Sequence, residues 1–341
     1  MVKLIIEVDI AVIGSGLSAI KAVSIFYNLG KKIIMIDSQT SEGGVLQSIN
    51  GGLKLTKVPI LIDQDLVQKI NIDEARCFNV ERIILKEGNI MAKILGYSNI
   101  AVEKTWIDKW LSRDNQCYSP NIYSSIKKYL GISEKGLYLI SNIRGINIDR
   151  QLIALSNGLL VKYKKLIYTW PLDIIDTYIF STKEDIKRTV REKIRDLLLK
   201  NISMYISLFV YSSNIEGQNL VIYQHGTKAS KFHTAVKFPF YNHSILYLIT
   251  SFSKDYTLIA GIGEKLLSEA RRYRLIDVKR IVKRHDIVIT YALLNKVDNR
   301  KITELREYLL EKNLILYGRC ALWKDLEISE ILVDRSLEQY I

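Results

Sequence analysis

The sequence has 341 residues, of which 48% are hydrophobic and 25% are charged, and its formal net charge is +13. This composition is typical of a soluble globular protein with enough apolar residues for two packed units. No apolar run is long enough to cross a bilayer, and the N-terminus leads into the first expected strand without a signal peptide. We therefore expect a cytoplasmic protein with no integral membrane segment.

The positive charge is compatible with an anionic small-molecule substrate, with a nucleic acid or acidic lipid surface, or with simple solubility. Its lysines and arginines are interspersed with acidic and apolar residues, as on solvated helix faces, which favours solubility over nucleic-acid binding. Abundant isoleucine and scarce glutamine fit a thermophilic or AT-rich source. The basic clusters lie at residues 162–165, 187–195 and 271–284.

The cysteines and histidines do not predict a metal site. Cys77, Cys117 and Cys320 are far apart and form no Cys-x-x-Cys motif. We therefore expect neither a disulfide framework nor a cysteine metal site. The four histidines have no metal-ligand spacing either, so we expect no bound metal.

A strand–helix–strand unit is expected at residues 8–37, in which Gly14, Gly16 and Ala19 separate the first strand from the helix. This spacing, with Asp37 ending the second strand, is that of a dinucleotide-binding unit. Gly14 would make the tight turn, Gly16 would let the backbone approach a pyrophosphate, and Ala19 would let the helix pack closely. The helix N-terminus would attract the phosphates. Asp37 would accept hydrogen bonds from a ribose hydroxyl and disfavour a 2′-phosphate. The alternative is a glycine turn in an ordinary α/β domain.

The rest of the chain alternates strands and helices without an internal repeat or a low-complexity linker. In chain order we expect strands at 45–62, 80–85 and 90–95, short helices over 101–135, a β-meander over 137–169, a buried strand at 165–172, a basic helix over 182–200, strands over 204–260, helices at 263–284 and 300–312, a strand at 315–317 and a final helix from about Glu327.

Three further patterns occur in a consistent order. Gly43 and Gly44 follow Asp37 by six and seven residues, Leu166–Leu172 is a short apolar strand ending at a proline, and Leu314–Glu330 is a strand ending in Gly-Arg followed by a helix. With these patterns the sequence resembles the flavin-containing amine oxidase superfamily, which includes protoporphyrinogen oxidases and UDP-galactopyranose mutases.

The resemblance implies an α/β fold in which a Rossmann-like FAD-binding domain carries an inserted mixed α+β substrate domain. The FAD-binding domain would comprise residues 1–62, 137–182 and 301–341, and the substrate or cap domain residues 63–136 and 183–300. The implied FAD-binding residues are Gly14, Gly16, Ala19, Asp37, Gly43, Gly44, Ile143, Thr169, Pro171, Gly318, Arg319, Glu327 and Ile328.

Each later motif has an implied role. Gly43 and Gly44 would let the backbone pass close to the ribityl chain and diphosphate, and Arg319 would place its guanidinium on a phosphate. The helix from Glu327 and Ile328 would point N–H groups at the flavin ring and stabilise negative charge on it. The backbone at Ile143 would hold the adenine.

The implied function is that of an FAD-dependent oxidoreductase in which flavin N5 accepts a hydride from a small organic substrate. The alternative is a non-redox mutase acting on a nucleotide sugar, but the chain departs from that pattern. Ile60 follows Pro59 where the mutases have a histidine, and Trp323 stands where they have a tyrosine. A third interpretation is a binding protein that keeps the flavin fold without turnover. A homo-oligomer is left open.

Residues 221–241 combine two histidines, three lysines and several aromatic residues. In the family, the comparable sheet covers the flavin face, so His225, His233 and Lys237 are candidate substrate contacts, and His233 is a candidate general base. The alternative, favoured for any single residue, is a structural histidine or a lysine that extends to solvent. Trp323 is a third catalytic candidate, through stacking of its ring. Tyr291 is a weaker candidate, more simply explained as a core residue.

Overall fold

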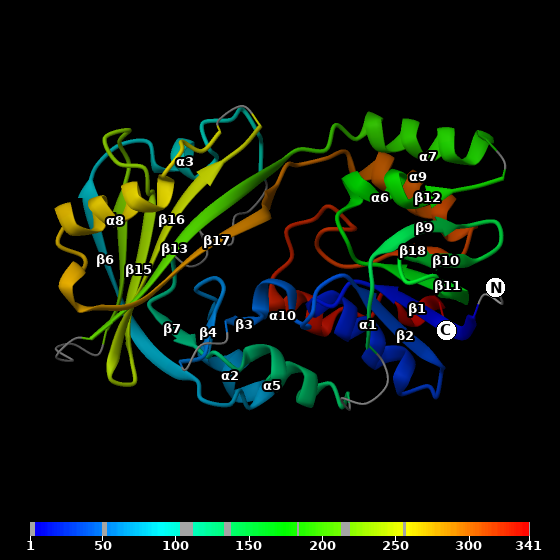
Figure 1. The fold of residues 1–341 in the computed structure, drawn as a ribbon, viewed down its shortest axis with the longest axis horizontal. Coiled ribbons are helices and arrows are strands. Elements are labelled where there is room, and N and C mark those ends of the chain that lie inside the picture. The colour runs from blue at the N-terminus through cyan, green and yellow to red at the C-terminus, as the bar shows by residue number, and fades with distance from the viewer. Residues whose placement is uncertain are drawn as a thin grey trace. The chain divides into compact units, whose positions relative to one another are not determined.

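The computed structural model describes residues 4–49, 53–102, 112–132, 138–182, 184–212, 219–254 and 257–340. The chain divides into two compact units (Figure 1). Unit 1 comprises Met1–Gln47, Ile122–Leu199 and Lys296–Ile341, and unit 2 comprises Ser48–Asn121 and Lys200–Asn295. Each unit is therefore built from separate segments of the chain. The bounds differ from the expected ones: residues 48–62 belong to unit 2, and residues 122–136 and 183–199 belong to unit 1.

An eight-stranded mixed sheet forms the centre of unit 1, in the order β12-β9-β10-β11-β1-β2-β8, with β18 paired to β11. Its strands are β1 (Ile5–Ile13), β2 (Ile33–Asp37), β8 (Tyr138–Ile140), β9 (Ile143–Asn147), β10 (Leu152–Leu155), β11 (Leu160–Tyr168), β12 (Ile179–Phe180) and β18 (Leu314–Leu316).

Five of these strands run parallel, in the order β8, β2, β1, β11 and β18. β11 pairs along its length with β1, while its other edge pairs first with β10 and then, from Leu166 to Tyr168, with β18. β2 is buried throughout, as expected for a parallel strand covered on both faces. The carboxyl ends of the parallel strands therefore meet at one edge of the sheet.

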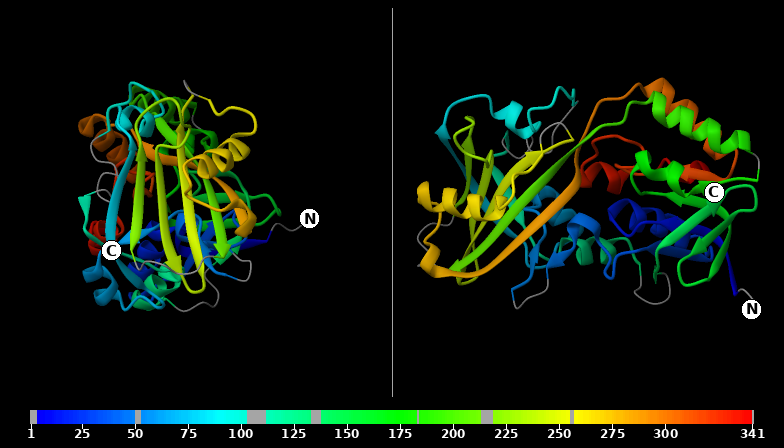
Figure 2. Two further views of the ribbon diagram at one scale, coloured as in Figure 1. Left: turned by 90° about the vertical axis from the view of Figure 1, so that its left-hand side faces the viewer. Right: turned by 45° about the horizontal axis from the view of Figure 1, so that its top comes forward.

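Helices cover this sheet. α1 packs on β1 and β2, and α7 lies beside α9, as Figures 1 and 2 show. The helices of unit 1 are α1 (Leu17–Tyr27), α5 (Ile122–Tyr129), α6 (Ile175–Tyr178), α7 (Glu184–Asp196), α9 (Asn299–Leu310) and α10 (Ile328–Val333), with the 3₁₀ turns η1 (Gly44–Leu46), η2 (Leu172–Ile174) and η4 (Glu338–Tyr340).

Unit 2 contains a second eight-stranded sheet, in the order β17-β13-β16-β15-β14-β6-β7-β5, and a two-stranded ribbon of β3 and β4. Among the described residues, its strand pairs are antiparallel except for the parallel pair of β14 with β6. The strands are β3 (Ser48–Ile49), β4 (Leu55–Thr56), β5 (Leu61–Ile62), β6 (Arg76–Lys86), β7 (Asn115–Tyr118), β13 (Asn201–Ser212), β14 (Leu220–His225), β15 (Thr234–Phe240), β16 (His243–Phe252) and β17 (Ile281–Leu294).

The helices of unit 2 are α2 (Gln64–Ile70), α3 (Ile90–Ile94) and α8 (Ile262–Arg272), with the 3₁₀ turn η3 (Val278–Arg280). α8 lies across one face of the sheet (Figure 2). Its apolar residues Ile262, Leu266 and Ala270 pack into a buried cluster with Phe209 and Leu248 of the strands. Burial of such residues is the main stabilising term for this unit.

Three local expectations are wrong. Residues 90–95 form α3 instead of a strand, because the Asn89 side chain caps the helix by accepting a hydrogen bond from the Ala92 N–H at 2.9 Å. The meander is interrupted, since β8 pairs with β2 and only β9 to β11 form antiparallel neighbours. The helix expected over 263–284 ends at Arg272. Part of the helical region expected at 101–135 lies outside the described residues.

The cysteines require a correction as well. Cys77 of β6 and Cys117 of β7 lie directly opposite each other in an antiparallel pair and form a disulfide. No disulfide was expected, because a sequence separation of 40 gives no local signal. The pairing depends on the strand register, which sequence spacing does not reveal.

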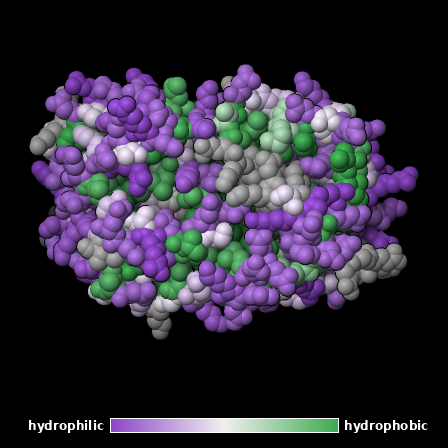
Figure 3. Space-filling view, turned by 180° about the vertical axis from the view of Figure 1, so that it is seen from behind, coloured by the Kyte–Doolittle hydropathy of each residue, from purple (hydrophilic) through white to green (hydrophobic). Residues whose placement is uncertain are grey.

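Hydrophilic side chains cover most of the molecular face shown in Figure 3, with the apolar ones scattered among them. Among the helices of the described residues, none has both the length and the apolar character needed to cross a bilayer.

Candidate functional site

The carboxyl ends of four parallel strands of unit 1 bring the sequence motifs together. β1 is followed by Gly14, β2 ends at Asp37, β11 is followed by Thr169, and β18 is followed shortly by Gly318. In open α/β sheets, ligands bind at this edge. Four motifs that are far apart in the sequence therefore share one candidate site.

The turn after β1 leads directly into α1. The Gly14 N–H donates to the Ile36 carbonyl at 2.9 Å, and its φ of +109° is one that glycine adopts readily. A Cβ on Gly14 would also overlap the Thr169 hydroxyl. A side chain at this position would therefore break the close approach of β1 to β11.

Gly16 is the residue that leaves space for a ligand. It caps α1 with an extended backbone, and a Cβ built on it would meet no atom within 4 Å. No side chain caps α1, and its first turn has no acidic residue. The N-terminus of this 11-residue helix thus presents backbone N–H groups and a positive dipole end beside open space, as an anion requires.

Asp37 lies beside this turn and is 7% exposed. The Ser15 hydroxyl donates to its Oδ2 atom at 2.6 Å, and the Gln39 N–H lies 3.3 Å from Oδ1. The Ser15 bond ties the glycine turn to the end of β2 and orients the carboxylate. Oδ1, with only one long hydrogen bond, keeps the capacity to accept a ribose hydroxyl.

Gly43 and Gly44 lie against the same turn. The Gly43 N–H donates to the Ser15 carbonyl at 2.9 Å, and a Cβ on Gly44 would lie 3.6 Å from Gly16 Cα. Both glycines have positive φ angles, +114° and +57°. The two glycine motifs, Gly14 with Gly16 and Gly43 with Gly44, therefore form one surface of backbone atoms, which we call the glycine cradle.

A hydrogen-bonded cluster holds this cradle from the side of α5. The Tyr123 hydroxyl lies 3.1 Å from the Ser15 carbonyl oxygen and 3.2 Å from Glu42 Oε2, so its single proton is shared between these two acceptors, and Lys127 Nζ lies 2.6 Å from the same Glu42 oxygen. Burial, followed by the charge of Glu42, raises the pKa of Tyr123, so the phenol keeps its proton. The cluster fixes the glycine turn in place.

The central motif supports the site from β11. The Thr169 hydroxyl donates to the Ile13 carbonyl at 2.6 Å, and the Pro171 carbonyl accepts from the Tyr168 hydroxyl at 3.0 Å. Ile143, the expected adenine contact, is buried at the start of β9. These bonds join β11 to β1 and shape the turn after it.

The C-terminal motif meets the first helix. Gly318 has a φ of +85°, and a Cβ on it would overlap the Ser18 side chain in the first turn of α1. Arg319 is paired within its own loop, with its Nε atom 3.1 Å from Asp325 Oδ1. Both side chains are largely buried. Because Asp325 holds this nitrogen, Arg319 braces its own loop, and its expected contact with a phosphate stays a prediction.

The structure argues against two other expectations for the C-terminal motif, the stacking of Trp323 and the role of the α10 N-terminus. Trp323 is 3% exposed, so the protein itself covers its ring and leaves little surface for stacking on a ligand. α10 begins after Glu327 at Ile328, as expected, but Glu327 and Glu330 form a capping box. Glu330 Oε2 accepts from the Glu327 N–H at 2.7 Å. Two carboxylates at this helix start oppose the expected stabilisation of a negative ring.

In unit 2, His233 is fully buried and its ring nitrogens are satisfied. Nδ1 lies 2.9 Å from the Thr234 hydroxyl and Nε2 3.0 Å from the Ser251 hydroxyl. Burial lowers its pKa to about 3. An enclosed imidazole whose two nitrogens already have hydrogen-bond partners is not open to a substrate, which favours the alternative of a structural histidine over a general base.

The neighbouring candidates are also enclosed or at the surface. His225 is buried, with Nε2 2.6 Å from the Tyr273 hydroxyl. Lys237 of β15 is half-buried, and its Nζ lies 5.7 Å from the centre of the Tyr211 ring. Tyr291 lies half-buried on β17. Lys237, His225 and His233 thus each have partners other than one another.

Sequence reasoning missed the residues that hold the cradle. Ser15, Ser18, Tyr123 and Lys127 contact the motifs through side chains, and two of them, Tyr123 and Lys127, belong to no motif. Lys93 was missed as well: it is buried on α3, where its Nζ donates to the carbonyls of His225 at 2.8 Å and Phe232 at 2.6 Å. A lysine within an apolar run is the only signal that the sequence offers for it.

Comparison with known proteins gives a result only at the level of structure. No protein-family model matches the chain, and no curated protein matches its sequence. The structure of a reduced UDP-galactopyranose mutase is similar with a TM-score of 0.73 and 14% identity, over 93% of this chain and 89% of that one.

Structures of putrescine oxidase are similar as well. A variant redesigned in cofactor binding has a TM-score of 0.58 and 10% identity, over 83% of this chain and 84% of that one. The wild type bound to putrescine has a TM-score of 0.56 and 11% identity, over 83% of this chain and 85% of that one. The chain thus shares the overall fold of these solved structures, with a Rossmann-like α/β sheet in unit 1.

Proposed function

We propose that this protein is an enzyme that binds FAD in unit 1 and acts as an FAD-dependent oxidoreductase. The observation that carries the proposal is the open space beside Gly16, at the uncapped N-terminus of α1. Gly44 adjoins it and the Asp37 carboxylate lies beside the same turn. Backbone N–H groups for a pyrophosphate and a carboxylate for a ribose are the two recognition elements that the adenosine half of FAD requires.

Different residues of unit 1 would contact different parts of the bound FAD. The first turn of α1 would hold the diphosphate, Asp37 Oδ1 would accept a ribose hydroxyl, and Gly43 and Gly44 would let the rest of the cofactor pass close to the backbone. Ser15 and Tyr123 would keep this geometry fixed before binding, which reduces the entropy lost on association. FAD, when bound, supplies hydride acceptance at N5 of its ring.

A non-redox mutase on a nucleotide sugar is the second candidate. Its support is the similarity to the mutase structure, with a TM-score of 0.73 against 0.56 to 0.58 for the oxidase structures. Against it stand the sequence departures at Ile60 and Trp323. Since Trp323 is buried, it offers no exposed group in place of the missing tyrosine hydroxyl.

The first test is the identity of the bound cofactor. The purified protein is denatured, and the released material is compared by chromatography with FAD, FMN and NAD standards. We expect a yellow protein that releases FAD in a near equimolar amount. A colourless protein that takes up no added FAD would overturn the proposal and leave a binding protein without turnover.

The second test separates the two enzyme classes. Putrescine and UDP-galactopyranose are each supplied to the oxidised and to the chemically reduced protein. An oxidoreductase is bleached by its substrate when oxidised and needs an acceptor for turnover. A mutase isomerises its sugar only when reduced, without net redox change. The substrates represent an amine and a nucleotide sugar, so a negative result with putrescine alone calls for other amines.

A further inference from the structure

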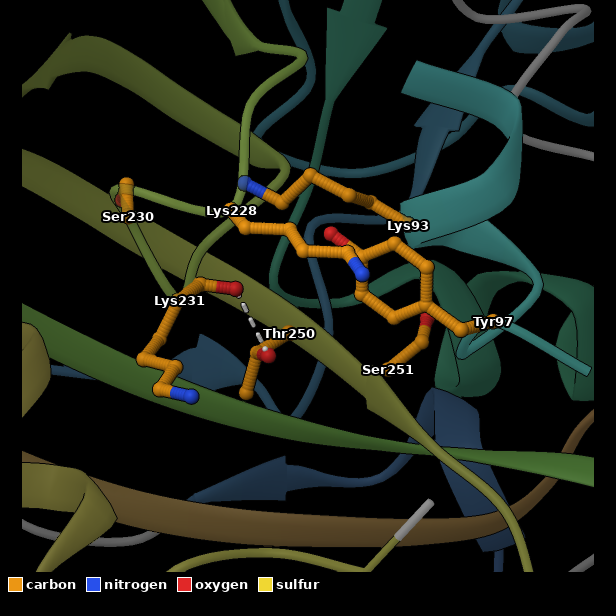
Figure 4. Close-up of a pocket in the computed structure, with 7 residues that line it drawn as sticks. All are labelled: Lys93, Tyr97, Lys228, Ser230, Lys231, Thr250 and Ser251. Carbon is orange, nitrogen blue, oxygen red and sulfur yellow. Dashed lines mark hydrogen bonds between the residues drawn. The ribbon is translucent and has the colours of Figure 1, made fainter. Parts of the chain in front are cut away.

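Unit 2 contains a small pocket that the proposed cofactor site does not include. It has a volume of about 200 Å³ and is lined by Lys93, Tyr97, Lys228, Ser230, Lys231, Thr250 and Ser251 (Figure 4). Three of these residues are lysines, and none is acidic. Every lining residue belongs to unit 2, so the pocket is complete within that unit.

Lys93 places a positive charge inside this pocket. Its side chain is 4% exposed, and its ammonium donates to the carbonyls of His225 and Phe232. An ammonium has three hydrogens, so these two bonds leave one for a ligand. Burial lowers the pKa of Lys93 to about 8, which still leaves it mostly protonated at neutral pH.

The acidic residue that acts on the Lys93 charge is Glu269, and its carboxylate already accepts hydrogen bonds from other residues. Glu269 attracts the Lys93 charge, but its carboxylate accepts from the Ser230 hydroxyl at 2.6 Å and from the Lys231 N–H at 2.9 Å. Glu269 does not line the pocket. The positive charge of the lining is therefore only partly balanced.

Lys228 supplies a second positive charge, on a side chain that is free to change its rotamer. It is exposed, and its Nζ lies 5.0 Å from the centre of the Tyr97 ring. Figure 4 shows its side chain alongside that of Lys93 but running the opposite way, so that the two ammonium groups lie at opposite ends, and the Lys231 side chain turns away from both. An exposed lysine can change rotamer at small cost, so its ammonium can close on an anion held by Lys93.

The hydroxyl groups of Thr250 and Ser251 are hydrogen-bonded within the protein and do not compete with the ammonium groups for a ligand. Thr250 Oγ1 donates to the Lys231 carbonyl at 2.9 Å, and Ser251 Oγ lies 3.0 Å from His233 Nε2. The ammonium groups are therefore the main recognition elements, and they favour a ligand with concentrated negative charge. No arginine lines the pocket to form the planar fork that suits a carboxylate, whereas lysine binds phosphate as a point charge.

We propose that this pocket binds the phosphate group of a small phosphorylated molecule, held between Lys93 and Lys228. The site does not depend on the proposed cofactor, because no residue of the glycine cradle lines it.

The test is calorimetric titration of the whole protein with inorganic phosphate. Phosphate could also bind at the N-terminus of α1, so the site is located with variants. Lys228→Ala should weaken binding at the unit 2 pocket by about tenfold or more, the usual effect of losing a charged hydrogen bond. Lys265→Ala removes the same charge from the exposed surface of α8 and should leave binding unchanged. The cofactor content of each sample is measured separately, so failure of one proposal is not confused with failure of the other.

A second readout does not depend on a variant. Phosphate should slow acetylation of Lys228 relative to Lys265, as measured by mass spectrometry of the treated protein. Malonate at equal concentration should protect far less. Absence of protection, an equal effect of the two alanine variants, or equal protection by malonate would each overturn the assignment to phosphate.

Discussion

Gly318 lies against Ser18, so closely that any Cβ at position 318 would overlap the serine side chain. This contact joins the loop after β18 to the first turn of α1, across 300 residues of sequence. Because the N-terminus of α1 is the candidate phosphate site, the contact also fixes the C-terminal motif beside it. A glycine is required here for two reasons, its φ of +85° and the lack of space.

The two reasons can be separated by a matched pair of variants. Gly158 has a φ of +86° but no atom within 4 Å of its would-be Cβ. Gly158→Ala should cost about 1–2 kcal/mol of unfolding free energy through the backbone alone. Gly318→Ala should cost about 1–3 kcal/mol more, because Ser18 must move. Urea unfolding of both variants measures the difference, and equal losses would contradict the close contact.

A substitution at Gly16 should affect the ligand and spare the fold. Its extended backbone accepts any residue, and its Cβ would meet no protein atom. We expect Gly16→Ala to unfold at the wild-type temperature when free of cofactor, but to bind FAD about 5- to 150-fold more weakly, since a methyl group would enter the pyrophosphate position. Fluorescence titration of the stripped protein with FAD measures this. Unchanged affinity would show that the phosphates lie elsewhere.

The sequence predicted the backbone of this site better than its side chains. Gly14, Gly16 and Asp37 follow a short-range pattern in which spacing largely determines which residues meet, and the fold has the glycine turn after β1 and Asp37 at the end of β2, as expected. The Tyr123 bond to Ser15 and the Cys77–Cys117 pair depend on how distant segments pack, and no local pattern encodes this. His233 shows the same limit: its residue type suggests chemistry, whereas its burial, known only from the fold, makes it structural.

We expect the Tyr123 hydroxyl to stabilise the glycine cradle through its contacts with the Ser15 carbonyl and Glu42. Tyr123→Phe removes its bonds to the Ser15 carbonyl and Glu42, and we expect a loss of about 0.5–1.5 kcal/mol in unfolding free energy together with weaker FAD binding. Tyr129→Phe is the control, because Tyr129 lies exposed on the same helix. It should change stability by less than about 0.5 kcal/mol. Similar losses in both variants would mean that the hydroxyl of Tyr123 does not support the turn.

His233 should make the stability of the fold sensitive to acid. Burial lowers its pKa to about 3 in the folded protein, against about 6.5 in an unfolded chain. Between these values the unfolded state binds a proton that the folded state does not. The unfolding free energy therefore rises with pH in this window, by up to about 1.4 kcal/mol per pH unit from this group, and its full contribution is present above about pH 6.5.

His233→Gln tests this assignment. The amide can still bond to the hydroxyls of Thr234 and Ser251, but it does not titrate. Urea unfolding at intervals between pH 4 and pH 8, which covers most of the window between the two pKa values, should give a shallower slope below about pH 6.5 for the variant. Above that pH the two slopes should agree, which serves as the internal control. A variant slope equal to that of the wild type in the acid range would mean that His233 takes up its proton in the folded protein.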